Sequence, residues 1–122
     1  MKAKKDNKVL NDSKLFAIRI IKLYQFLVEK KQEYILSKQV LRSGTSIGAN
    51  VRESVNAKSK LDFIHKLNIA LKEANETEYW LELLHESAYI NERQFNSIYY
   101  DCGIIAATLT NIILTTKNNI NN

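Results

Sequence analysis

The sequence predicts an all-α protein, folded as an up-down-up-down antiparallel four-helix bundle that assembles into a homo-oligomer. Three observations lead to the bundle. The 122 residues contain no proline and only three glycines, too few for the tight turns of sandwiches, barrels and doubly wound sheets. Four segments repeat apolar residues at helical spacing. The links between them are short, which makes consecutive helices antiparallel. Residues 1–122 are expected to form a single domain.

The first helix is predicted over residues 12–31, with Asp12 as its cap. Nearly all residues between its evenly spaced polar positions are apolar, so its apolar surface is wider than the stripe that one packing partner covers. We therefore expect this helix to be covered on two sides, one of them by another subunit. Residues 1–10, which include four lysines, are predicted to be a flexible basic arm.

The second helix is predicted over residues 37–57. Gly44 and Gly48 lie inside it, and each costs about 1 kcal/mol relative to alanine. Close approach of a neighbouring helix would offset that cost, because small residues let two backbones come together. Val40, Gly44, Ile47, Val51 and Val55 form one face of this helix. A second, polar face consists of Gln39, Arg42, Ser46, Asn50 and Glu53.

The third helix shows the clearest pattern, with Ser59 as cap and Asp62 three residues later. Apolar and small residues alternate at four- and three-residue steps, which is a heptad seam. Its members are Phe63, Leu67, Ala70, Ala74, Thr77, Leu81, Leu84 and Ala88.

The fourth helix is predicted to begin with a capping box formed by Asn91 and Gln94. Its apolar positions continue from Phe95 to Ile113. Residues 118–122 are polar apart from one isoleucine and are predicted to be a frayed tail.

Charge is distributed unevenly along the chain, whose formal net charge is +5. Residues 1–72 carry 16 basic and 6 acidic side chains, a net of +10, whereas residues 73–122 carry 2 and 7, a net of −5. Such asymmetry indicates how a protein meets its partners. The basic half can bind nucleic acid or the acidic half of another copy.

The third helix has its charges in the order that the helix dipole disfavours, with lysines in the first half and glutamates in the second. The cost is a few tenths of a kcal/mol for each end residue. Partners on another subunit, or a bound polyanion, would explain the arrangement.

Two short motifs resemble catalytic motifs but lack the structural setting that catalysis requires. Residues 44–48 spell G-x-S-x-G, which activates a serine only at a strand-to-helix turn, and a helical interior is predicted here. Glu82 and His85 form an E-x-x-H pair, and Asp62 and His65 a looser one. A di-iron site needs such pairs on different helices. We expect no enzyme activity, no metal and no cofactor.

Other chemically distinctive residues are expected to be structural. Cys102 has a core position and cannot form an intrachain disulfide, which indicates either a reducing compartment or a protein indifferent to the redox state. Four aromatic residues at helical spacing are expected in the core or an interface, with base stacking as the alternative: Tyr79, Trp80, Tyr99 and Tyr100. No signal-peptide core and no 18-residue apolar stretch is evident, so we expect a cytoplasmic protein without a membrane span.

Arg42 and Glu53 lie on one side of the second helix, three turns apart. We expect both side chains to be partly buried and to pair with charged groups, within the chain or across a subunit interface. An ordinary solvated face is the alternative.

Residues 33–53 resemble the signature of the 23S rRNA-intervening sequence proteins. The matching positions are Glu33, Leu36, Gln39, Arg42, Ser46, Ile47, Asn50 and Glu53. Downstream, Phe63, Leu67, Ile69, Ala70, Glu76, Thr77 and Glu78 resemble the family's third helix. Two features depart from the family: Ser54 replaces a usual glycine, and no proline precedes the second helix.

The resemblance implies a small cytoplasmic bundle without enzyme activity, which assembles as a homo-oligomer, with a pentamer as the expected state. A related retroelement accessory protein forms a basic ring that engages nucleic acid and a reverse transcriptase. The resemblance to the family also gives a set of candidate interface residues: Gln39, Arg42, Ser46, Asn50, Glu53, Glu76 and Glu78.

Two functions remain open at the level of sequence. The first is a nucleic-acid-binding or RNP-associated module whose lysines contact the phosphates of RNA or DNA. The candidate residues are Lys2, Lys4, Lys5, Lys8, Lys14, Lys22, Lys30 and Lys31. The second is a scaffold that binds only protein, in which these lysines face Glu73, Glu76, Glu82 and Glu86 of a neighbouring copy.

Overall fold

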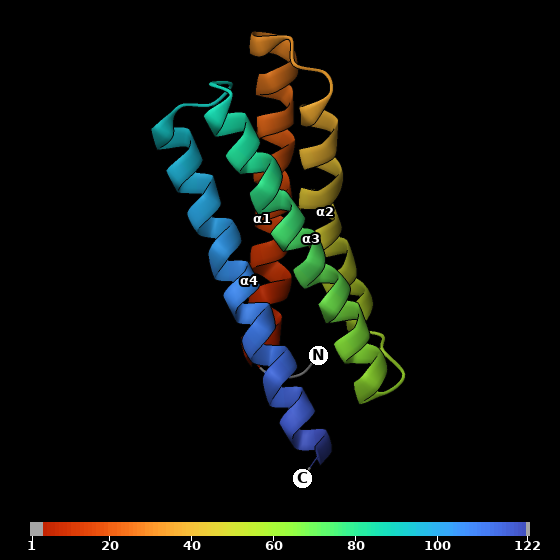
Figure 1. The fold of residues 1–122 in the computed structure, drawn as a ribbon. Coiled ribbons are helices and arrows are strands. Elements are labelled where there is room, and N and C mark those ends of the chain that lie inside the picture. The colour runs from red at the N-terminus through yellow and green to blue at the C-terminus, as the bar shows by residue number, and fades with distance from the viewer. Residues whose placement is uncertain (1–3, 122) are drawn as a thin grey trace.

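The computed structural model describes the backbone of residues 4–121 and the side chains of residues 8–120. Within this part the chain forms four helices and no strand: α1 (Lys4–Lys31), α2 (Leu36–Ser54), α3 (Lys60–Glu86) and α4 (Glu92–Asn121). The three links lie at alternate ends of the molecule, and both termini lie at the same end (Figure 1). The all-α fold predicted from the sequence is confirmed.

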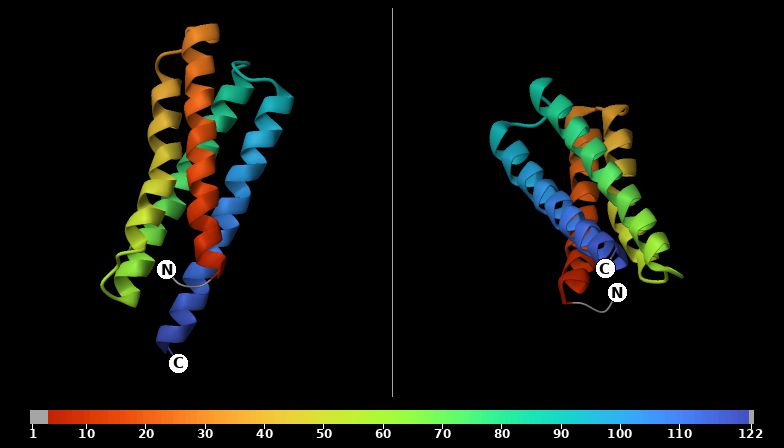
Figure 2. Two further views of the ribbon diagram at one scale, coloured as in Figure 1. Left: turned by 180° about the vertical axis from the view of Figure 1, so that it is seen from behind. Right: turned by 60° about the horizontal axis from the view of Figure 1, so that its bottom comes forward.

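Each helix packs against two others. The packed pairs are α1 with α2, α2 with α3, α3 with α4, and α1 with α4, the last being the smallest contact. Seen from behind, α1 lies between α2 and α4 (Figure 2, left). The first helix is therefore covered within the chain on two flanks.

The first helix begins eight residues earlier than predicted. It starts at Lys4 and already includes Val9, which is 1% exposed in the core. The flexible arm predicted over residues 1–10 is therefore helical from Lys4 onward, while residues 1–3 lie outside the described part. The buried contact of Val9 stabilises this first part of the helix, which the charge pattern alone did not indicate.

The C-terminal end differs in the same way. Helix α4 continues to Asn121, so the predicted frayed tail at 118–122 is helical over the described residues. Its side chains from Lys117 to Ile120 are exposed.

The two interior glycines of α2 lie where α1 comes close, as predicted. A Cβ atom at Gly44 would sit 2.7 Å from Cγ1 of Ile20, and one at Gly48 would sit 3.2 Å from the Ser13 carbonyl oxygen. Neither glycine has a positive φ, so space rather than backbone conformation requires them.

The link before α2 is stabilised by side-chain hydrogen bonds that the sequence did not indicate. The carboxylate of Glu33, which is buried, accepts hydrogen bonds from the backbone N–H groups of Ile35, Leu36 and Ser37 at 3.2, 3.0 and 2.6 Å. Glu33 thus satisfies N–H groups that the start of a helix leaves unpaired. This signature glutamate has a structural role.

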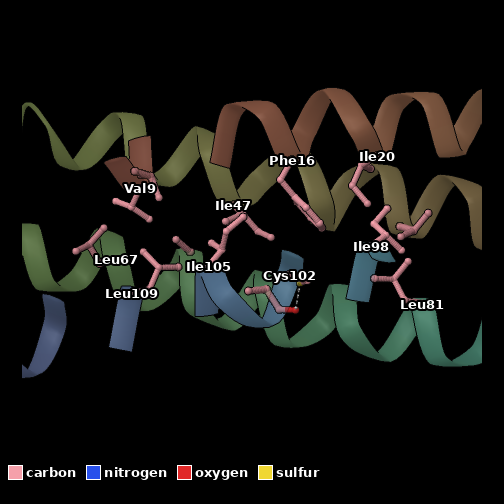
Figure 3. Packing of buried hydrophobic residues seen from close by; sticks show 14 of the residues in the cluster. Val9, Phe16, Ile20, Ile47, Leu67, Leu81, Ile98, Cys102, Ile105 and Leu109 are labelled. Atoms are coloured by element: carbon pink, nitrogen blue, oxygen red, sulfur yellow. Dashed lines mark hydrogen bonds between the residues drawn. The ribbon is translucent and has the colours of Figure 1, made fainter. Parts of the chain in front are cut away.

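The hydrophobic core lies between the helices, and all four contribute side chains to it (Figure 3). Six members of the predicted α3 seam are buried, from Leu67 to Leu84, whereas Phe63 is half-buried and Ala88 is exposed. Cys102 is fully buried and its Sγ lies 3.4 Å from the carbonyl oxygen of Ala74. Burial raises the pKa of this thiol to about 12, which fits its predicted structural role.

Helix α4 is unusually long and apolar. Its segment Glu92–Ile120 is, in the described part of the chain, the one helix long and apolar enough to cross a membrane by length and composition. From the sequence, we expected no 18-residue apolar stretch. Six of its apolar residues instead lie in the shared core: Ile98, Cys102, Ile105, Leu109, Ile112 and Ile113.

Candidate functional site

The candidate phosphate-binding lysines follow α1 but do not share one face. Lys14, Lys22, Lys30 and Lys31 are all exposed. Steps of eight residues place Lys14, Lys22 and Lys30 about 80° apart around the helix axis. The ammonium of Lys31 lies 5.9 Å from the ring centre of Phe26.

The remaining members of the set are at the start of the chain. Lys8 is exposed, and its ammonium pairs with Asp12 at 2.6 Å. Lys4 and Lys5 belong to α1, but their side chains lie outside the described part, as does the whole of Lys2.

The signature residues of α2 meet α3 in a network of ion pairs. Arg42 donates to both carboxylate oxygens of Glu73, at 2.8 and 3.4 Å, and also to Glu76. The indole N–H of Trp80 donates to Glu76 at 3.0 Å. One guanidinium therefore joins two carboxylates on successive turns of α3.

Hydrogen bonds in this network change the acidity of its members. The hydrogen bonds to Glu73 and then to Glu76 raise the pKa of Arg42. The bond from Trp80, followed by that from Arg42, lowers the pKa of Glu76. Both groups are therefore charged at neutral pH, so the network holds pairs of opposite charge.

A second ion pair lies nearer the end of α2. The ammonium of Lys66 contacts the Glu53 carboxylate at 3.1 Å. Arg42 and Glu53 thus pair with charged groups as expected, and both partners belong to α3 of the same chain. Their side chains are 50% and 57% exposed, so they are less buried than we expected.

Two other polar signature residues of α2 bond to their own helix. Ser46 donates to the carbonyl oxygen of Arg42 at 2.6 Å, and Asn50 donates to that of Ser46 at 2.8 Å. Gln39 is exposed on the same side. These contacts leave the α2 surface polar and ordered.

These pairs compensate part of the disfavoured charge order of α3. Lys66 has its partner on α2, and Glu73 and Glu76 have theirs in Arg42. The compensation that we expected from another subunit or a polyanion comes, for these residues, from the neighbouring helix.

Glu78 belongs to a different surface, between α3 and α4. Its carboxylate is the nearest group to a Cβ built at Gly103, at 3.8 Å. Burial and then the charge of Glu82 raise the pKa of Glu78. The hydroxyl of Tyr99 donates to Glu82 at 2.7 Å, and this bond above all raises the pKa of Tyr99 to about 12.

The residues that suggested catalysis are held in structural contacts. Ser46 lies in the middle of α2, without the turn that a nucleophilic serine needs. His85 stacks on Phe95 with ring centres 4.4 Å apart. In the described part of the chain, no three His, Cys, Asp or Glu residues are placed to hold a metal ion.

The four singled-out aromatic residues divide into two pairs. Trp80 and Tyr99 are half-buried and donate hydrogen bonds to glutamates. Tyr79 and Tyr100 are 53% and 68% exposed. Only the second pair presents open ring surface.

A groove of about 310 Å³ separates α1 from α4. Its apolar lining consists of Leu15, Phe16, Ile104 and Ile105. At its rim, the guanidinium of Arg19 pairs with Asp101 at 2.7 Å and so joins the two helices.

These features define a class of protein: a small all-α chain of four helices with an ordered polar face on α2 and α3 and exposed basic residues on α1. The model of the 23S rRNA-intervening sequence protein family matches residues 5–111, and the chain belongs to that family. No curated protein matches the chain.

A solved structure is similar over almost its whole length. It is the 1.70 Å crystal structure of a protein with unknown function from the S23 ribosomal protein family of Bacteroides thetaiotaomicron VPI-5482. The two chains are 59% identical, with a TM-score of 0.88, over 89% of this chain and 97% of the other.

Proposed function

We propose that this chain is a non-enzymatic cytoplasmic protein whose helices form an antiparallel bundle, which assembles with copies of itself and binds RNA or DNA. The alternation of the links between the two ends of the molecule supports the antiparallel arrangement. Lysine contacts to phosphates would supply the affinity, without sequence specificity.

The exposed cations of α1 carry the proposal. Lys14, Lys22, Lys30 and Lys31 are exposed, and none makes an ion pair with another residue of the described part. Unpaired cations at a surface release counterions when they meet phosphates, which is the main source of non-specific affinity for nucleic acid.

The competing function is a scaffold that binds only protein, with the lysines of one copy against the glutamates of the next. Two of the carboxylates that it requires, Glu73 and Glu76, are already bound to Arg42 of the same chain. This engagement favours nucleic acid as the ligand of the α1 lysines.

Exposed apolar residues along α1 and α4 support self-assembly. Leu15, Leu114 and Tyr100 are each more than half exposed, and the first of them lines the groove between the two helices. Removing these apolar side chains from water against a second copy is favourable. The family resemblance suggests five chains.

Filter binding of a structured RNA across a salt series tests nucleic-acid binding. We expect binding that weakens linearly with the logarithm of salt concentration and is similar for unrelated sequences. No binding at 50 mM salt, where phosphate contacts are strong, would exclude this function and leave the scaffold.

Light scattering tests assembly. Five chains of 14.1 kDa correspond to a particle of about 70 kDa. A mass equal to that of one chain at micromolar concentration would contradict self-assembly.

A further inference from the structure

A second groove, between α1 and α2, carries a cation from each helix. Its volume is about 390 Å³. Its lining combines small side chains with two basic ones, and contains no carboxylate: Lys14, Ala17, Thr45, Gly48, Ala49 and Arg52.

The close packing of the helices sets the positions of the two cations. A Cβ at Gly48 would lie 3.2 Å from the Ser13 carbonyl oxygen, so the backbones are near each other at this level. Lys14 follows Ser13, and Arg52 lies one turn after Gly48. The two basic side chains therefore stand on either side of the same groove.

The acidic residues nearest to the groove cations along the chain, Asp12 and Glu53, are already paired with Lys8 and Lys66. Residues 13–28 and 34–52 contain no aspartate or glutamate. Arg19 and Arg42 in these segments pair with α4 and α3, on other sides of the molecule. Among the described residues, Lys14 and Arg52 make no ion pair.

A further exposed cation, Lys38, lies on α2 in line with Arg52. Lys38, Thr45 and Arg52 recur every seven residues and so lie on nearly one line of the helix surface. Lys38 is exposed, and the 14 residue steps from it to Arg52 correspond to about 21 Å along the helix axis. A ligand that contacts both Lys38 and Arg52 is therefore longer than a single ion.

We infer that this groove binds the phosphodiester backbone of a single strand of RNA or DNA, with Lys14 and Arg52 contacting phosphates from its two walls. Proteins that bind single strands combine a positively charged groove that follows the backbone with aromatic rings that stack the bases. This groove supplies the first of these two kinds of contact. The inference rests on the proposed function and gives the location of nucleic-acid binding on the protein. It adds Arg52 and Lys38 to the residues that contact phosphates.

The small lining residues support this ligand. Ala17, Gly48 and Ala49 add little bulk between the two cations, so a phosphate can approach both. With no aromatic side chain in the lining, the groove offers no stacking surface for bases, and its contacts carry no sequence code.

The test compares two double variants for binding to labelled oligouridine. K14Q/R52Q removes both groove cations, and R93Q/K117Q removes the same charge from exposed positions on α4. We expect the groove variant to lower the salt slope by about 1.4, since each lost single-strand contact lowers it by about 0.7. The loss of affinity between 50 and 200 mM salt would then be about sevenfold smaller than in the parent. The control variant should retain the parental slope.

The outcomes separate this inference from the proposed function. If the parent binds oligouridine and both variants keep its slope, the groove assignment is wrong while nucleic-acid binding stands. If the parent binds no nucleic acid, both fail. If K14Q/R52Q folds by circular dichroism but loses its oligomeric mass in light scattering, the groove instead contacts a second copy, and the inference is also overturned.

Discussion

Replacing Gly44 by alanine tests the close packing of α1 on α2. The added Cβ would lie 2.7 Å from Cγ1 and 2.9 Å from Cγ2 of Ile20, both well inside van der Waals contact. Ile20 is fully buried, and its branched side chain has one strongly preferred rotamer in a helix. Neither residue can relieve the overlap by a simple rotation, so the helices must move apart.

The expected magnitude follows from two opposing effects. Alanine favours a helix interior over glycine by about 1 kcal/mol. Overpacking a well-filled core costs about 1–3 kcal/mol, and a clash with two carbons of a stiff side chain belongs at the upper end. Gly44→Ala should therefore lower the free energy of unfolding by about 2 kcal/mol.

Gly103 provides a matched control for the same substitution. It lies inside α4, and the nearest atom to its added Cβ is a carboxylate oxygen of Glu78 at 3.8 Å, an ordinary contact. Gly103→Ala should therefore raise the free energy of unfolding by about 0.5–1 kcal/mol.

Urea denaturation of the two variants and the parent, at one protein concentration, measures these changes. A Gly44→Ala variant as stable as Gly103→Ala would refute the packing argument. The double variant Ile20→Ala/Gly44→Ala adds a further check. Compared with Ile20→Ala alone it should be almost equally stable, because the side chain that clashes with the added Cβ has been removed.

Three further predictions concern single side chains. Arg42→Ala should lower the free energy of unfolding by about 1–2 kcal/mol, because it leaves Glu73, which is 13% exposed, without its charged partner; urea denaturation equal to the parent would contradict this. The raised pKa of Glu78 means that the folded protein favours the neutral carboxyl. The stability that the neutral form contributes is fully present below the unfolded pKa and is lost as pH rises through the folded pKa. Glu78→Gln should therefore melt at a higher temperature than the parent at pH 7, with a difference that vanishes near pH 4, and a constant difference would argue against burial as the cause. Cys102, whose pKa is about 12, should resist alkylation at pH 8 in the folded protein and react in urea, so fast reaction of the native thiol would show that it is accessible.

The helices and most of the core could be predicted from the sequence. Apolar residues at helical spacing must face one another to leave water, so the α3 seam from Leu67 to Leu84 follows from its steps of three and four. Gly44 and Gly48 indicated a close approach in the same way, because their cost in a helix has to be offset by contact. The family followed from the signature around Arg42.

The partners of the charged residues were decided by the tertiary structure. Helical spacing places Arg42 and Glu53 on one side of α2, but only the rotation of α3 about its own axis determines that they meet Glu73 and Lys66. The same holds for the groove that brings Arg52 beside Lys14, residues 38 positions apart. Periodicity along one helix specifies which residues share a face, whereas the contact between two faces depends on helix register, which close packing at Gly44 and Gly48 determines.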